Sequence, residues 1–127
     1  MICFNNECSE RSRFISRRFN GNNNPEGFWV KDSVWISRLF EDPYFVTLIK
    51  TRWDAKKSAL NGIFQYIDER VVYLDKAQDY NFKKWNILDK YVWPNAVVTG
   101  TYKAEIAYMK SWFTKRINWF DGAISGL

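Results

Sequence analysis

The chain has 127 residues and a net charge of +5, with 46% hydrophobic and 26% charged residues, a balance that suits one globular domain with one core. It contains no histidine, which excludes histidine-based catalytic triads, histidine zinc sites and the usual general base at neutral pH. Aromatic residues make up 19% of the chain. We expect so many large rings to exceed what a small core hides, so that some of them cover a partner or the missing part of a longer chain.

Residues 1–27 are predicted to form an extended arm that is basic and rich in asparagine. The asparagines and the turn formers Gly21, Pro25 and Gly27 interrupt any regular pattern there. Between them, arginines alternate with phenylalanines, at Arg11, Arg13, Phe14, Arg17, Arg18 and Phe19. Cationic and aromatic side chains together can grip single-stranded nucleic acid. Short basic tails are also common for solubility alone, and we favour this second interpretation over a nucleic-acid partner.

The same arm holds the only two cysteines of the sequence, Cys3 and Cys8. Two ligands do not make a zinc site, and a disulfide that closes so short a loop would add little constraint, so we interpret both as free thiols. The first eight residues lack the apolar run of a signal peptide. No stretch of the sequence approaches the roughly 20 apolar residues that a membrane span needs, and no membrane span is predicted.

From Asp32 onwards the signals are helical, and a domain is predicted over residues 28–127. A short helix, capped by Asp32 or Ser33, is expected to run to about Phe40. The second helix is expected over Pro43–Leu60, because Asp42 can cap it and proline fits a first turn, with a left-handed stop at Asn61-Gly62. One face of this second helix carries apolar side chains at helical spacing, namely Phe45, Leu48, Ile49 and Trp53.

A third, long helix is predicted from the apolar stripe that runs from Ile63 to Trp85 at steps of three and four. Residues 86–100 are expected to be irregular, because Trp93 precedes a proline and therefore prefers an extended backbone. The fourth helix is expected to start with Thr101 as its cap and to end at Asp121-Gly122. Its stripe is the most regular of the chain, with Ile106, Met109, Phe113, Ile117 and Phe120. Three main helices, one short helix and one irregular connection define an all-α fold, in which Trp35, Trp53 and Trp85 are expected in the core.

Several strings of the sequence resemble, in order and rough spacing from about Phe28 to Gly122, the C-terminal end of the spore-coat-protein-H (CotH) kinase-like family. They are Trp35-Ile-Ser-Arg-Leu-Phe-Glu-Asp-Pro-Tyr-Phe45, Arg52-Trp53, Asn81-Phe-Lys-Lys-Trp85, Tyr91-Val-Trp-Pro-Asn95, Thr101-Tyr102, Met109-Lys-Ser-Trp112 and Arg116-Ile-Asn-Trp119. The resemblance implies a relation to atypical protein kinases, which transfer a phosphoryl group from ATP to protein. The family's catalytic and metal-binding aspartates lie upstream, in an Asp-aromatic-Asp motif followed by Gly, and no counterpart precedes Phe28 in this sequence.

The resemblance therefore implies the C-terminal helical part of a kinase-like protein without its catalytic segment, inactive by itself. ATP and magnesium are expected only for an intact family member, so no cofactor is predicted for this chain. The implied partner is the missing N-terminal kinase-like part or another protein. Intact family members are often exported, so the missing signal peptide fits a fragment or a truncated gene better than an intact secreted protein, and the location of the chain stays open.

Acidic residues at Asp68, Asp75 and Asp79 share one helical face and could ligate a cation. No glycine-rich phosphate loop accompanies them, so a solvated face is the favoured interpretation, and no catalytic, cofactor-binding or metal residue is predicted. The predicted interaction surface consists of Trp93, Tyr91, Trp112, Arg17 and Arg18. The alternative hypothesis is a free-standing helical module that binds a protein, glycan or polyanion through its exposed aromatic residues and the basic arm.

Overall fold

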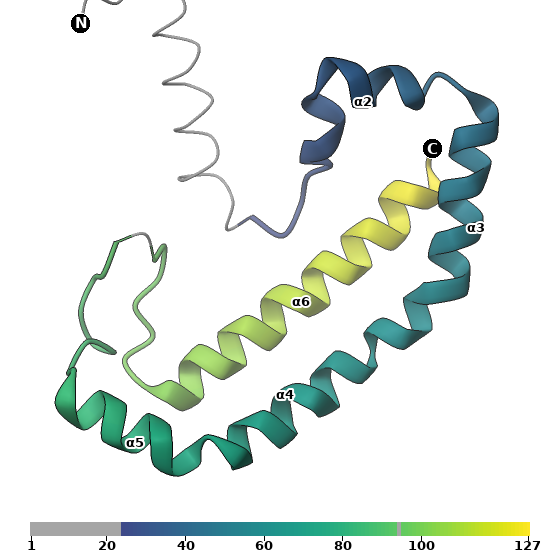
Figure 1. Cartoon of the computed structure of the whole chain (residues 1–127). Helices are drawn as coiled ribbons and strands as arrows, with labels where there is room; N and C mark the ends of the chain where they lie inside the picture. Colours follow the sequence, from purple (N-terminus) through teal and green to yellow (C-terminus); the bar gives the residue numbers. More distant parts are fainter. Residues whose placement is uncertain (1–23, 94) are drawn as a thin grey trace, which may run out of the picture.

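The computed structural model describes residues 24–93 and 95–127, and within these ranges it contains helices and no strand. The order of elements is η1 (Trp29–Asp32), α2 (Val34–Leu39), α3 (Pro43–Leu60), α4 (Gly62–Tyr73), α5 (Asp75–Lys84) and α6 (Tyr102–Ser125). Figure 1 shows that α3, α4 and α5 follow one another along a curved arc and that α6 runs back along the inside of this arc. The predicted all-α fold is confirmed.

Two helix starts lie where their capping residues predict them. At the start of α3, the Asp42 carboxylate accepts a hydrogen bond from the backbone N–H of Tyr44 at 2.9 Å, and Pro43 is the first helical residue. At the start of α6, the Thr101 hydroxyl accepts a hydrogen bond from the backbone N–H of Ala104 at 3.1 Å. Both caps satisfy a backbone donor that has no partner inside its own helix, and both predictions are confirmed.

Helix α3 covers Pro43–Leu60 as predicted, but its predicted left-handed stop and two other predicted helix boundaries are wrong. Asn61 has right-handed helical torsion angles, φ −64° and ψ −26°, and Gly62 is the first residue of α4, so no left-handed stop separates α3 from α4. The predicted third helix is divided at Leu74 into α4 and α5, which follows the bend of the arc around α6. Helix α6 continues past Asp121-Gly122 to Ser125. Asp121 accepts hydrogen bonds from Trp53 and Lys57 of α3. This tertiary contact offsets the roughly 1 kcal/mol that Gly122 costs inside the helix.

The chain enters the helical part through a segment for which the sequence predicted no regular structure. Residues Trp29–Asp32 form η1, so Asp32 ends one helix, and Ser33 precedes α2 without a side-chain capping bond. The preceding Phe28 ring packs against Phe40 of the α2–α3 connection and against Phe120 of α6, at centroid distances of 5.5 and 5.4 Å. This aromatic contact holds η1 and α2 against the end of α6. Capping residues, from which helix starts are predicted, give no sign of it.

The core of the described part is thin. Only Ile67 of α4 and Ile124 of α6 are buried there, with 8% and 6% of their surface exposed. The predicted α6 stripe is half-buried, because one arc of helices covers one side of α6. Trp53 is also half-buried, but Trp35 and Trp85 are 82% and 58% exposed. Their predicted place in the core is therefore wrong.

Candidate functional site

The residues predicted to form an interaction surface come from separate elements. Tyr91 and Trp93 are exposed in the connection between α5 and α6. Trp112 lies within α6, is half-buried and stacks edge-to-face on the neighbouring Phe113 ring at 5.6 Å. Arg17 and Arg18, together with Cys3, Cys8 and the other residues of the arm before position 24, lie outside the described residues. The surface as predicted from the sequence therefore stays a prediction.

A second group of residues, which we name the Arg116 cluster, consists of Arg116, Trp119, Phe120 and the segment 25–29. The Arg116 guanidinium donates hydrogen bonds to the carbonyl oxygens of Pro25 and Gly27, both at 2.8 Å. Its Cζ atom lies 4.6 Å from the centroid of the Trp29 ring and 4.1 Å from that of Phe120. Partial burial lowers the pKa of Arg116, and ring faces and carbonyl oxygens replace water around the cation. Arg116 therefore fixes the segment before η1 onto α6.

Gly27 belongs to this cluster because its backbone adopts a conformation that favours glycine. Its φ is +133°, and a Cβ atom placed there would lie 2.4 Å from Nε1 of the Trp29 indole. Side chains other than hydrogen are strained at such torsion angles. The glycine lets the chain turn so that its carbonyl oxygen reaches Arg116.

A third group joins α3 to α6 through one carboxylate. Asp121 Oδ1 accepts hydrogen bonds from Trp53 Nε1 at 2.7 Å and from Lys57 Nζ at 3.1 Å, and Lys57 also forms an ion pair with Asp54 at 3.2 Å. The hydrogen bond from the Trp53 indole, and then that from Lys57, holds the pKa of Asp121 below its ordinary value. The Asp121 and Asp54 carboxylates correspondingly raise the pKa of Lys57.

These shifts predict a pH dependence of stability. The pKa of Asp121 is lower in the folded chain than in the unfolded chain. The stabilisation by its carboxylate is therefore complete above the pKa of the unfolded chain, about 3.9, and is lost as the pH falls through the pKa of the folded chain. We expect the melting temperature of the wild-type chain to fall between about pH 5 and pH 2, and this fall to be smaller in Asp121→Asn, which keeps an acceptor for Trp53. Thermal melts at a series of pH values test this. Parallel curves for the two proteins would contradict it.

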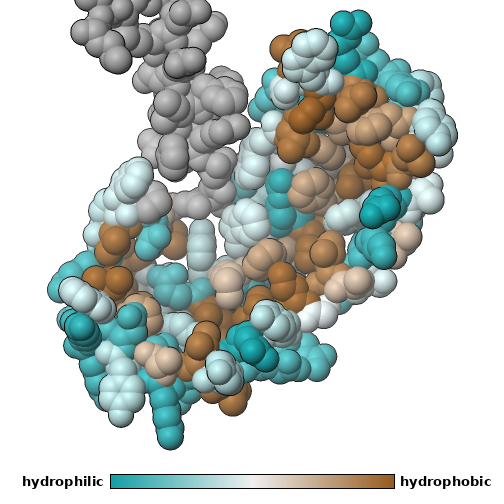
Figure 2. All heavy atoms as spheres, in the orientation of Figure 1, coloured by the Kyte–Doolittle hydropathy of each residue, from teal (hydrophilic) through white to brown (hydrophobic). Residues whose placement is uncertain are grey.

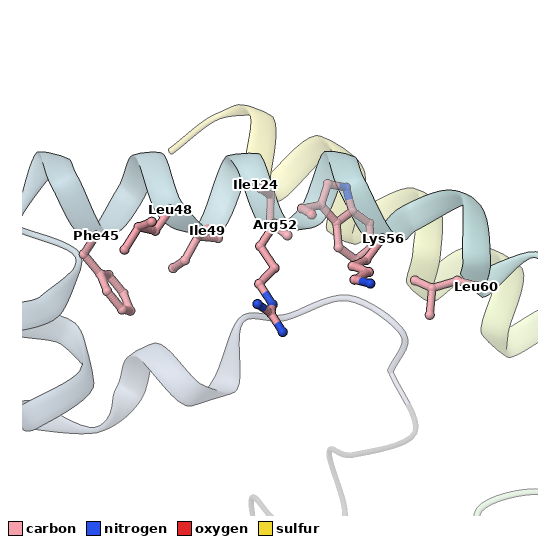
Figure 3. Close-up of a pocket in the computed structure, with 8 residues that line it drawn as sticks. Phe45, Leu48, Ile49, Arg52, Lys56, Leu60 and Ile124 are labelled. Atoms are coloured by element: carbon pink, nitrogen blue, oxygen red, sulfur yellow. The ribbon is translucent and has the colours of Figure 1, made fainter.

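A hollowed surface lies along α3, and we name it the α3 groove. It is an open groove of about 530 Å³ that is lined almost entirely by apolar atoms. Figure 3 shows its side chains pointing to one side of α3, with Ile124 contributed by α6. Figure 2 shows hydrophobic surface gathered at the end of the molecule where α2, α3 and the end of α6 meet. The lining residues are Phe45, Leu48, Ile49, Arg52, Trp53, Lys56, Leu60 and Ile124.

Two cations, Arg52 and Lys56, line the α3 groove one helical turn apart. Among the described residues, no carboxylate lies within ion-pair distance of either cation, whereas Lys57, which faces α6, pairs with two. The sequence placed Phe45, Leu48, Ile49 and Trp53 on one face and so contained the groove's apolar stripe. It did not reveal which of these residues would stay uncovered, because that depends on where α6 crosses α3. Leu48 is exposed, whereas Phe45, Ile49 and Trp53 are half-buried.

The three acidic residues lie on two helices, Asp68 on α4 and Asp75 and Asp79 on α5, and all three are exposed. Asp68 is bonded to Lys110 of α6, and Asp79 is paired with Lys83 of its own helix at 2.6 Å. In the described ranges, no three residues of the metal-binding types are grouped so that they could hold an ion. A smaller hollow of about 260 Å³ lies under the connection between α5 and α6, where Glu105 accepts a hydrogen bond from the Thr99 hydroxyl at 2.8 Å.

Comparisons of the chain with protein-family models, with curated proteins and with solved structures find no match. The resemblance to the CotH kinase-like family therefore stays a hypothesis from the order and spacing of the sequence strings. Among the described helices, none has the length and apolar character required to cross a membrane.

Proposed function

We propose that this chain is a helical interaction module with the architecture of the C-terminal part of a CotH-like kinase, and that it transfers no phosphate by itself. The observation that carries the proposal is the α3 groove, which lies beside a core where two of the described residues are buried. A monomer that is complete by itself rarely leaves a large apolar surface of this kind open. In the proposal, the groove is covered by the N-terminal kinase-like part or by another protein.

The placement of the strings that suggested the family supports the proposal indirectly. Trp53, from the Arg52-Trp53 string, stacks on Phe120 at 5.8 Å. Arg116 and Trp119, from the Arg116-Ile-Asn-Trp119 string, lie in the adjoining Arg116 cluster. These residues pack and orient helices. Such a structural role suits the part of a kinase that supports the catalytic part. Phosphoryl transfer itself needs carboxylates that converge on magnesium.

The experiment is to produce the chain together with the catalytic N-terminal part of a CotH-family kinase as a separate polypeptide. We expect the two to elute together in size-exclusion chromatography, and the melting temperature of the chain to rise, because a partner that binds only the folded state stabilises it. With magnesium and ATP, the chain alone is expected to release no phosphate above a buffer blank. Separate elution would reject the kinase-like partner. Phosphate release by the chain alone would overturn the proposal if Asp75→Ala abolished it.

The same groove also supports the alternative of a free-standing interaction module, whose partner is unrelated to a kinase. The two hypotheses differ in one outcome. If the catalytic part elutes separately while a polypeptide still binds in the α3 groove, the module is free-standing. If the catalytic part binds, and if this binding is lost when the groove is altered, the chain is the helical part that supports a kinase.

A further inference from the structure

We infer that the α3 groove binds an amphipathic helix of about four turns whose apolar face is flanked by acidic side chains. This inference rests on the proposed function as an interaction module and adds the chemistry of the partner. It follows from three features of the described residues: the length of the apolar stripe, the two cations without a carboxylate partner, and the charge of the other segments that could cover the groove.

The length of the stripe sets the length of the partner. The lining residues of α3 run from Phe45 to Leu60, and 15 helical steps of about 1.5 Å span roughly 22 Å. Leu48, about one turn after Phe45, is 49% exposed. A helix laid along such a groove inserts side chains at positions i, i+3, i+4 and i+7. About 15 residues, or four turns, cover the stripe completely.

The two cations set the charge of the partner. Figure 3 shows Arg52 and Lys56 on the same side of α3 as the apolar residues, so a helix in the groove meets both. Covering them with an apolar or basic surface would remove two charges from water without a partner, which is costly. Two carboxylates spaced one turn apart on the bound helix would neutralise both cations, and complementary charges of this kind also speed association.

Charge also argues against two other occupants. The arm of this chain before position 24 carries four arginines against two glutamates, Glu7 and Glu10, so its net charge is positive, as are Arg52 and Lys56. A second copy related by a two-fold axis would present the same lining, which adds two more cations and no carboxylate. An acidic amphipathic helix from another polypeptide would bring negative charge to Arg52 and Lys56 instead.

The test is fluorescence anisotropy of the full chain with a fluorescein-labelled 18-residue peptide that has leucines on one helical face and glutamates beside them. A scrambled peptide of the same composition is the first control. We expect the designed peptide to bind at least about tenfold more tightly than the scrambled one, because only it forms one continuous apolar face. Equal affinity for both peptides would overturn the inference.

The second part of the test reverses the groove charges. The double variant Arg52→Glu with Lys56→Glu is expected to weaken binding of the acidic peptide by about tenfold or more, and to bind a peptide with lysines in place of glutamates more tightly than the wild-type chain does. The matched control is Lys76→Glu with Lys103→Glu, which changes the net charge equally at exposed positions away from the groove. If this control weakens binding as much, only net charge is recognised and the inference fails.

The third part separates the remaining occupants. Sedimentation of the chain alone, with Leu48→Asp as the comparison, shows whether copies associate through the groove, and self-association that this variant abolishes would assign the groove to a second copy. Binding to anionic phospholipid vesicles that Leu48→Asp removes, without peptide binding, would assign it to a membrane surface. Both results overturn the inference. Peptide binding without binding of the kinase catalytic part supports the groove chemistry and rejects only the kinase-like partner.

Discussion

Phe120→Ala is expected to lower the free energy of unfolding by about 2–4 kcal/mol, the largest effect of a single substitution in this chain. The Phe120 ring lies between three aromatic rings, those of Phe28, Trp53 and Trp119, at centroid distances of 5.4, 5.8 and 5.5 Å. It therefore joins the entry segment, α3 and α6 at one point. Fully buried phenylalanines cost about 3–5 kcal/mol when truncated, and Phe120 is half-buried, which places the expected loss below the upper end of that range.

Urea unfolding followed by far-ultraviolet circular dichroism measures this loss. Tyr80→Ala is the matched control, because Tyr80 is an exposed aromatic residue of α5, and surface substitutions of this kind change stability by about 0.5 kcal/mol or less. If both variants unfolded at the same urea concentration as the wild-type chain, the aromatic junction around Phe120 would not stabilise the fold.

Arg116→Leu is expected to release segment 25–32 from α6 and to cost about 2 kcal/mol of stability. The substitution removes two hydrogen bonds from a charged donor to the Pro25 and Gly27 carbonyl oxygens. It also removes the cation from the faces of the Trp29 and Phe120 rings. A leucine fills part of the space but leaves both carbonyl oxygens without their donor.

Hydrogen exchange of the Lys31 amide, which bonds to the Phe28 carbonyl oxygen at 2.8 Å in η1, reports the release of this segment. We expect faster exchange at Lys31 in Arg116→Leu and an intermediate rate in Arg116→Lys, because a single ammonium group cannot reproduce the planar fork of the guanidinium. Unchanged exchange in both variants would mean that the aromatic contacts of Phe28 alone hold η1 in place.

The parts of the fold that follow from local chemistry could be predicted from the sequence. The caps at Asp42 and Thr101 depend on a side chain two or three residues from its donor, and the stripe of α6 depends on spacing within one helix. The boundary after Gly122 depends on the hydrogen bonds of Asp121 with α3, and the division at Leu74 follows the bend of the arc around α6. Such contacts override local propensity, so neither boundary was visible in the sequence.

The candidate site could be predicted only in part. Its apolar stripe on α3 was evident, but the sequence suggested that Trp35 and Trp85 would be buried and gave no reason for this stripe to stay open. The difference arises because α6 meets α3 through Trp53, Lys57 and Asp121 and leaves Leu48 exposed. The role of Arg116 was also hidden, because its carbonyl partners lie about 90 residues earlier in the chain.

The measurement that tests the central claim most directly is a calorimetric titration of the chain with the catalytic part of a CotH-family kinase, using the wild-type chain and Leu48→Asp. Leu48 is half exposed in the groove, so the substitution alters the proposed interface while the fold is retained, as circular dichroism can verify. The proposed function predicts one-to-one binding by the wild-type chain and its loss in Leu48→Asp. Absence of binding by the wild-type chain, or equal binding by the variant, would contradict the claim that the α3 groove carries a kinase-like partner.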